Sequence, residues 1–274
     1  MKRRSTTAGK YLFAVLQTIL AFGPLIWVFF MSFRTTDEIR KAPYTFPDVW
    51  HFEKYLEVWN NSGYKIYFAN SIFVVGLAVV TIIAITTMSA YCFAKLPFKG
   101  SELLFNLVFT TIMLPAQIII IPLFQDMVKM KLVNSLFGLA MVYVAIQMPI
   151  SIYILRSFFA QIPNEMREAA KIDGCSEIKT FWKIMFPIAK PAISTILIID
   201  FVNLWNEFLF GSIFIQDESK KTLPLGIIKF VGDVNEDLGR IAVGMMIAII
   251  PLIILYSIFS ENFIKGMTAG AVKG

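Results

Sequence analysis

Six long apolar stretches are the feature that most constrains what this chain can fold into. They lie at residues 11–33, 67–94, 103–128, 133–155, 192–215 and 241–260. A helix needs about 20 mostly apolar residues to cross a bilayer, and within lipid only helices and closed barrels satisfy the backbone. Because the stretches are continuous rather than alternating, we predict an all-α membrane protein with six transmembrane helices. Hydrophobic residues make up 57% of the chain, against about 45–50% in soluble domains, which excludes a soluble globular fold.

The charged and reactive residues exclude several classes of function. The formal charge is +6, but the basic residues lie between the apolar stretches rather than in one patch with aromatics, so no nucleic-acid binding is expected. Cys92 and Cys175 are predicted to lie at or near the cytoplasmic side, where no disulfide is expected. His51 is the only histidine and is expected to be solvated in a polar loop. We therefore predict no catalytic residue, no metal site and no enzymatic activity.

The distribution of basic residues predicts the orientation. With the N-terminus inside, the inner segments 1–10, 95–102, 156–191 and 261–274 carry 14 Lys and Arg residues, against 11 in the outer segments. Cytoplasmic loops carry the excess of Lys and Arg, so both termini are predicted to be cytoplasmic. The first stretch is longer than the apolar part of a signal peptide, about 7–15 residues, and no small-residue cleavage site follows it. It is predicted to remain as a helix.

Three prolines, Pro115, Pro122 and Pro149, interrupt the third and fourth stretches. A proline inside a helix removes a backbone hydrogen bond and kinks the helix. Two explanations fit the pattern equally well. The kinks adjust helix packing, or they form a flexing wall of a transport pathway.

The most informative segment is the predicted cytoplasmic loop 162–191, which reads IPNEMREAAKIDGCSEIKTFWKIMFPIAKP. Asn164 is predicted to cap the start of a short helix, and Gly174 has the residue type best suited to its left-handed C-cap. Ser176 is predicted to cap a second helix, which Pro187 is expected to stop. The loop is therefore predicted to form a compact helix–turn–helix.

The second helix of this loop has two explanations. It offers apolar anchors at Phe181, Trp182, Ile184 and Met185, separated by lysines. These side chains suit contact with another protein, and they also suit a helix that lies on anionic lipid headgroups. The paired alanines at positions 169 and 170 allow close approach to another surface, which favours the protein contact.

The loop has the spacing EAA, three residues, Gly, nine residues, and then Ile-x-Phe-Pro. This pattern resembles the EAA loop of binding-protein-dependent ABC importer permeases, and its one departure is Phe186, where Leu is commoner. The resemblance implies a type-1 ABC importer permease fold, in which this loop is the coupling helix seated in a groove of an ATP-binding subunit. The residues that it assigns to ATPase coupling are Glu168, Ala169, Ala170, Asp173, Gly174 and Pro187.

Two further segments narrow the resemblance. Residues 203–209 read NLWNEFL, similar to the WNEF segment of carbohydrate-type permeases, and residues 266–274 read GMTAGAVKG, similar to the tail of maltose-permease G-type subunits. With MLPAQIIIIPLF at 113–124, the resemblance runs from about residue 11 to the end of the chain. It implies import of a sugar (an oligosaccharide, glycoside or related carbohydrate) across a bacterial or archaeal plasma membrane.

The resemblance also implies the partners: a second homologous permease, two ATP-binding subunits and an extracytoplasmic sugar-binding protein. No G-x-x-x-x-G-K-[ST] phosphate loop occurs in the sequence. ATP and Mg²⁺ are therefore expected on the partner ATPase, and this chain is expected to bind no cofactor. The outer loop 216–240 is expected to face the binding protein. The tail residues expected to reach between the ATPase subunits are Gly270, Ala271, Val272 and Lys273.

The predicted organisation has three parts. A cytoplasmic N-terminus covers residues 1–10, the transmembrane permease domain covers 11–262 with its core at about 67–262, and a cytoplasmic tail covers 263–274. The coupling loop 162–191 belongs to the permease domain.

Polar residues in the fifth stretch are candidates for the substrate pathway, because polar groups inside a membrane are usually functional. Asp200, Asn203 and Glu207 are spaced i, i+3 and i+7, which predicts one stripe of a helix, and Asp200 is expected to be wet near the cytoplasmic end. The candidate pathway residues are Asn203, Trp205, Asn206 and Glu207. They would contact sugar or join helices, and a structural or gating role is favoured.

Three other classes of protein fit the sequence less well. A secondary transporter would couple transport through intramembrane acids and inverted repeats, but the chain has two such acids and a structured loop. A membrane scaffold offers no explanation for that loop. A permease for peptides or amino acids lacks the WNEF and TAGAVKG segments. The sequence does not identify the sugar or the residues that contact it.

Overall fold

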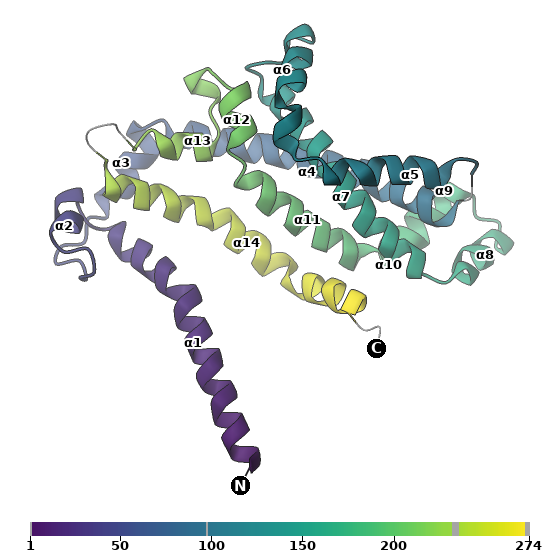
Figure 1. The fold of residues 1–274 in the computed structure, drawn as a ribbon, viewed down its shortest axis with the longest axis horizontal. Coiled ribbons are helices and arrows are strands. Elements are labelled where there is room, and N and C mark those ends of the chain that lie inside the picture. Colours follow the sequence, from purple (N-terminus) through teal and green to yellow (C-terminus); the bar gives the residue numbers. More distant parts are fainter. Residues whose placement is uncertain (1, 97, 232–235, 272–274) are drawn as a thin grey trace. The chain divides into compact units, whose positions relative to one another are not determined.

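The computed structural model describes residues 2–96, 98–231 and 236–271. All regular elements in these ranges are helices, which agrees with the predicted all-α class (Figure 1). The chain divides into two compact units. The first comprises Met1–Tyr67 and Leu225–Ile250, and the second comprises Phe68–Pro224 and Pro251–Gly274.

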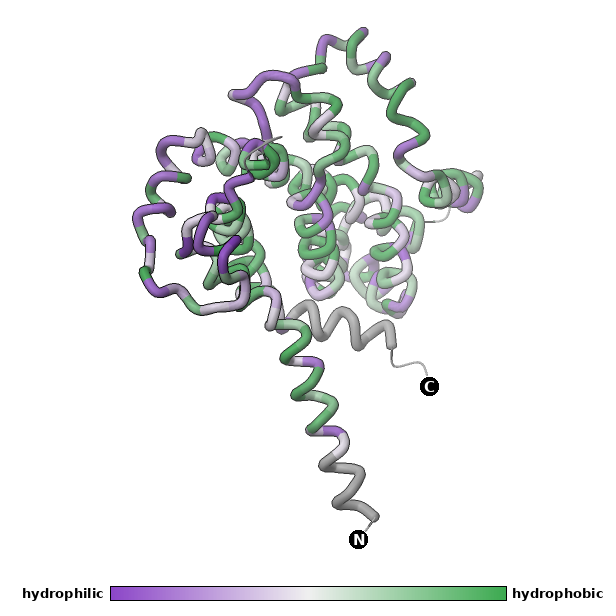
Figure 2. Tube along the Cα trace, turned by 60° about the vertical axis from the view of Figure 1, so that its left-hand side comes forward, coloured by the Kyte–Doolittle hydropathy of each residue, from purple (hydrophilic) through white to green (hydrophobic). Residues whose placement is uncertain are grey.

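The first unit is built around the long helix α1 and the polar segment that follows it. Its helices are α1 (Lys2–Met31), α2 (Thr36–Lys41) and α3 (Glu53–Asn61), with parts of α4 (Tyr64–Lys95), α13 (Leu223–Ile228) and α14 (Leu238–Ala271). The described part of α1 is predominantly hydrophobic (Figure 2). Its most apolar window has no buried residue, as expected for a helix that faces lipid or another subunit.

Aromatic rings join the end of α1 to the segment that follows it. Phe33 packs against Trp50, Phe52 and Tyr55, with ring centroids 5.0–5.4 Å apart. The sole histidine, His51, is half-buried, and its Nδ1 lies 2.6 Å from Oε1 of Glu53. The expectation that this histidine is simply solvated is therefore wrong.

The second unit carries the remaining helices. They are most of α4, α5 (Ser101–Thr110), η1 (Thr111–Met113), η2 (Ala116–Ile119), α6 (Ile120–Lys129), α7 (Leu136–Gln161), α8 (Asn164–Ile172), α9 (Glu177–Thr180), the π-helical turn η3 (Phe181–Met185), α10 (Phe186–Ile188), α11 (Lys190–Trp205), α12 (Leu209–Phe214), η4 (Glu218–Lys220) and the end of α14. Helix α7 packs along α11 and against α5. A buried apolar cluster that includes Tyr91, Phe159 and Met185 joins α4 and α7 to the turn η3.

Four helices are long and apolar enough to cross a membrane: Gly9–Met31, Tyr64–Lys95, Leu136–Gln161 and Leu238–Glu261. Two further candidates are bent pairs, Ser101–Met113 with Ala116–Lys129 at 96° and Glu177–Ile188 with Lys190–Trp205 at 72°. The described chain therefore has four to six candidate spans, and the count of six remains a prediction.

Two of the predicted stretches differ from the structure. The third is not one kinked helix, because the chain breaks at Leu114 and Pro115, where proline supplies no N–H to continue the helix. The fifth does not reach residue 215. Helix α11 ends at Trp205, and the Glu207 carboxylate accepts hydrogen bonds from the backbone N–H groups of Phe210 and Gly211 at the start of α12 (2.7 and 3.1 Å).

Candidate functional site

The predicted coupling loop forms the expected helical hairpin. Helix α8 ends at Ile172, and Gly174 follows its C-cap residue with a φ of +75°, which lies in the left-handed region. The N–H of Gly174 donates to the carbonyl of Lys171 at 3.0 Å, and the N–H of Cys175 donates to that of Ala170 at 2.9 Å. These two bonds form a Schellman motif, so the predicted C-cap is confirmed. The cap of the second helix is also confirmed, because the Ser176 hydroxyl accepts from the N–H of Lys179 at 3.3 Å.

Two details of the predicted hairpin are wrong. Asn164 does not cap α8, because it is already the first helical residue and its Oδ1 accepts from Nζ of Lys95 at 2.8 Å. Pro187 does not stop the second helix. The chain passes through a π-helical turn directly into α10, and Pro187 lies within this continuous helical run.

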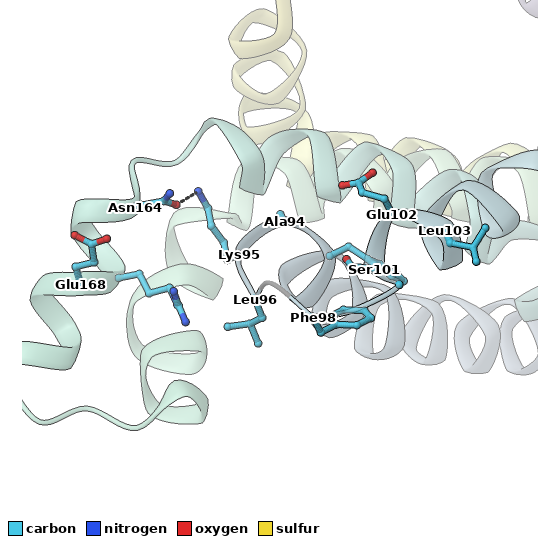
Figure 3. Close-up of a pocket in the computed structure, with 12 residues that line it drawn as sticks. Ala94, Lys95, Leu96, Phe98, Ser101, Glu102, Leu103, Asn164 and Glu168 are labelled. Atoms are coloured by element: carbon cyan, nitrogen blue, oxygen red, sulfur yellow. Dashed lines mark hydrogen bonds between the residues drawn. The ribbon is translucent and has the colours of Figure 1, made fainter.

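Lys95 holds the start of α8 against the end of α4. Its side chain is 7% exposed, and its Nζ donates to the carbonyl of Ile162 and to the side chain of Asn164. Figure 3 shows the bond from Lys95 to Asn164. A buried ammonium needs such acceptors, since an unpaired buried charge is strongly unfavourable.

Glu177 is the second point at which this loop is held. The Tyr91 hydroxyl of α4 donates to its Oε2 at 2.9 Å. From α8, the guanidinium of Arg167 donates to both carboxylate oxygens, and Nζ of Lys171 lies 2.7 Å from Oε1. The hydrogen bond from Arg167 is the main reason why the pKa of Glu177 falls to about 2. One carboxylate therefore connects α4, α8 and α9.

Helix α8 presents a mixed face to the outside of the chain. Glu168, Ala169 and Asp173 are exposed together with Gly174, whereas Ala170 is buried against the rest of the unit. Sequence reasoning missed two apolar residues on this surface, Met166 (42% exposed) and Ile172 (86% exposed). Their i, i+3, i+6 spacing with Ala169 was the signal that could have identified them.

The predicted anchors of the second helix are used differently. Phe181 and Met185 are buried in the apolar core of this unit, so they are not available to a partner. Trp182 is 51% exposed and Pro187 is exposed. The exposed apolar side chains of the hairpin therefore come from α8 and also from Ile178 and Trp182 of the second helix.

A cavity of about 580 Å³ lies beside the first turn of α8 (Figure 3). It is lined from three helices, and its charged residues are Lys95, Glu102, Arg167 and Glu168. Glu102 is ion-paired with Arg156 of α7. Both signs of charge are present, which suits the side chains of a protein partner better than a single small ion.

Asp200 is buried between α11 and α7. It is 1% exposed, and its carboxylate accepts from Nε2 of Gln147 at 2.9 Å and from the Ser151 hydroxyl at 3.0 Å. The expectation that Asp200 is wet is therefore wrong. The single stripe with Asn203 and Glu207 is also wrong, since Glu207 lies beyond the end of α11.

The structure places the four predicted pathway residues in different surroundings. Trp205 is 2% exposed and packs against the rings of Phe68 and Phe201. Glu207 also accepts from the Tyr143 hydroxyl at 2.7 Å. Their role in a pathway stays a prediction, as does that of Asn203 and Asn206, which are both exposed.

The predicted tail lies at the end of the described chain. Gly270 and Ala271 are the last residues of α14, whereas Val272 and Lys273 lie outside the described residues. In the outer loop 216–240, residues 232–235 likewise lie outside the described part. Within the residues that the structure does describe, no group of three or more His, Cys, Asp and Glu side chains could hold a metal ion.

Comparisons with known proteins agree with this architecture. The family model described as "Binding-protein-dependent transport system inner membrane component" matches residues 82–269, more than half of the chain. The trehalose/maltose transport system permease protein of Thermococcus litoralis is 33% identical over 265 residues, covering 95% of each chain. The sulfoquinovosyl glycerol transport system permease protein of Agrobacterium fabrum is 32% identical over 271 residues, covering 97% of this chain and 95% of that protein.

The fold itself matches a solved structure. A chain of a bacterial ABC transporter involved in the import of the acidic polysaccharide alginate superimposes with a TM-score of 0.84 at 23% identity, covering 96% of this chain and 98% of that chain. The likeness confirms that the helices have the arrangement of an ABC importer permease.

Proposed function

Because the chain belongs to the family of binding-protein-dependent transport system inner membrane components, we propose that it is a permease subunit of an ATP-driven importer for a sugar. The observation that carries this proposal is the hairpin α8–α9. Its α8 face is exposed and partly apolar, with Ile172 86% exposed, while its other side is fixed to α4 by Lys95 and Glu177. Such a face suits a groove on another subunit.

The energy for transport would enter through this hairpin. The sequence has no phosphate loop, so ATP and Mg²⁺ would be bound by two partner ATPase subunits. Closure of those subunits on ATP would move α8, and the ties to α4 would carry the movement into the membrane-spanning helices as a rigid-body switch. The hairpin and both termini would then lie on the cytoplasmic side, and the tail after residue 263 would reach the ATPases.

The remaining partners follow from the same proposal. A second homologous permease would complete the pathway, and a sugar-binding protein would dock on the opposite side, against the outer loop 216–240. The proposed substrate class is carbohydrate, since the two permease relatives are named for trehalose/maltose and for sulfoquinovosyl glycerol.

Co-purification tests the proposal. The chain is tagged in its host, extracted in mild detergent, and the proteins that accompany it are identified by mass spectrometry. We expect an ATPase and a second permease. Ile172→Asp should reduce the recovered ATPase about tenfold or more, because burying one isoleucine contributes about 1.5–3 kcal/mol.

A matched control lies in the same hairpin. Ile178 of α9 is 73% exposed, and Ile178→Asp makes the same chemical change outside α8. We expect it to keep the ATPase. Recovery of the chain without any ATPase in several mild detergents, or equal loss in both variants, would overturn the proposed role of α8.

A further inference from the structure

A cavity of about 660 Å³ lies between the broken third stretch and α7. Thr111, Pro115 and Gln117 line it from the broken stretch, and Ala145 and Pro149 line it from α7. The last two residues lie near the middle of this 26-residue helix. Two of the three prolines that interrupt the sequence therefore meet in one cavity, at the depth where α7 would cross the centre of a membrane.

Both walls of this cavity have interrupted backbone hydrogen bonding. On one side the chain is extended at Leu114 (φ −86°, ψ 122°) and at Pro115 (φ −57°, ψ 124°) before the short helix η2 begins at Ala116. On the other side Pro149 has no N–H to donate to the carbonyl of Ala145, four residues earlier. Ala145 lines the same cavity. Its carbonyl therefore lacks the usual helical N–H donor at a point where a molecule in the cavity could donate a hydrogen bond instead.

The break is not covered by its own chain. Met113 is 77% exposed, Leu114 is 56% exposed, and Gln117 is exposed. Non-helical backbone at membrane depth is tolerated only where it is buried in protein or lines a water-filled cavity. Lipid cannot pair with the amide of Gln117, so the open side of this cavity is better explained by water and a polar solute.

We propose that this cavity is a carbohydrate-contact site of the transport pathway, built from Gln117 and the carbonyl of Ala145 as hydrogen-bonding groups. Pro115, Pro149 and their apolar neighbours form the surface for the C–H faces of the sugar ring. The proposal rests on the proposed import of a sugar. It places substrate at the break of the third stretch, separate from residues 203–207.

The cavity also indicates which sugars it accepts. None of the residues that line it is charged, and its few polar groups stand among apolar side chains. Binding sites of this kind orient a ligand by a small number of placed polar groups. A charged sugar would lose hydration here without gaining a counter-ion. The site therefore selects a neutral glycoside over an anionic one.

Cysteine accessibility tests the site in the assembled complex. In a Cys92→Ala, Cys175→Ser background that retains transport, Gln117→Cys is exposed to a membrane-impermeant methanethiosulfonate in proteoliposomes. The matched control is Leu107→Cys, on the exposed apolar surface of α5 (58% exposed) and not among the residues that line the cavity. Both variants are examined without nucleotide and after trapping with Mg-ATP and vanadate.

We expect Gln117→Cys to react in at least one of the two states and Leu107→Cys to react in neither. Binding protein loaded with trehalose or maltose, whichever stimulates ATP hydrolysis, should slow the reaction at Gln117→Cys at least fivefold. A Gln117→Cys that never reacts, or reacts without protection by sugar, overturns the proposal. Stimulation by sulfoquinovosyl glycerol and by neither neutral sugar also overturns it.

A second pair of variants separates this site from the proposed function. Gln117→Leu should lower sugar uptake about tenfold, the loss expected when one hydrogen-bonding group is left unpaired, while Gln117→Asn should recover most of it. Stimulation of ATP hydrolysis by loaded binding protein is measured in the unmodified complex beside them. Loss of that stimulation in the unmodified complex would count against sugar import itself, whereas equal uptake by Gln117→Leu and the unmodified chain would count against this site alone.

Discussion

Replacing Lys95 with methionine tests whether this side chain transmits movement of the hairpin to the membrane helices. Lys95 is 7% exposed and bridges the end of α4 to the carbonyl of Ile162 and the side chain of Asn164. Methionine keeps most of the volume and removes both donors. A buried acceptor left without its partner costs about 1–3 kcal/mol, and relief from burying the ammonium offsets part of this. We expect the start of α8 to be held less tightly by about 2 kcal/mol.

Hydrogen exchange measures this change directly. A loss of about 2 kcal/mol corresponds to a roughly 30-fold increase in local opening of the first turns of α8. The ATPase should still co-purify, because the exposed face of α8 is unchanged, but fewer sugars should be transported per ATP hydrolysed. Lys99→Met is the matched control, since Lys99 is exposed and is four residues further along. Unchanged exchange in α8, or the same coupling ratio in Lys95→Met and Lys99→Met, would refute the reasoning.

Three further predictions concern other contacts. Because the pKa of Glu177 is lowered to about 2, its ion pairs contribute fully to the stability of the hairpin above a pH of about 4.5, and this contribution is lost as the pH falls toward 2. Hydrogen exchange of the α9 amides, corrected for intrinsic rates, should therefore rise between these two pH values. Gly226→Ala should lower the free energy of unfolding by about 1–3 kcal/mol, measured by thermal denaturation in detergent, because a Cβ would lie 2.2 Å from Cδ2 of Tyr67. A double-mutant cycle of Ser151→Ala and Asp200→Ala should give a coupling energy of about 1 kcal/mol in the same assay.

Each of these predictions has a control. Glu177→Gln should remove the acid transition of the α9 amides, and a transition that persists in this variant would assign it to another group. Gly76→Ala, at a position where a Cβ meets nothing within 4 Å, should be neutral or slightly stabilising; equal destabilisation at Gly76 and Gly226 would contradict the steric argument. A coupling energy near zero would show that the Ser151–Asp200 bond does not join α7 to α11.

Two helix caps of the hairpin were predicted correctly, because each depends only on residues that are close in the sequence. Gly174 follows a helix at a point where a left-handed residue is needed, and Ser176 precedes the next helix, so both caps could be predicted from neighbouring residues alone. Asn164 is also a common capping residue, but Lys95 supplies a competing donor from about 70 residues earlier in the chain. A partner so remote in sequence leaves no local signal.

The extent of the membrane helices was predicted less well for a related reason. Hydropathy measures whether a residue tolerates lipid, and the residues on both sides of Pro115 and Asn206 do. Whether the helix continues depends on where the backbone finds its hydrogen bonds. Glu207 shows this, because its carboxylate starts α12 instead of extending the stripe that its spacing from Asp200 predicts. The exposed face of α8 was predicted in part, since the motif identified the helix while burial of Ala170 decided its orientation.

The exposed apolar surface of α1 determines which amino-acid substitutions this helix tolerates. Since none of the most apolar window of α1 is buried by the rest of its chain, those side chains contribute little to the stability of the folded unit through internal packing. Their substitution by other apolar residues leaves the internal packing untouched, so sequence drift in this helix is limited by hydrophobic length and by whatever neighbour covers it in the assembly. A saturation library over residues 11–22 therefore separates two kinds of neighbour. Uniform tolerance of apolar residues marks contact with lipid, and a periodic stripe of intolerant positions marks the surface of another subunit.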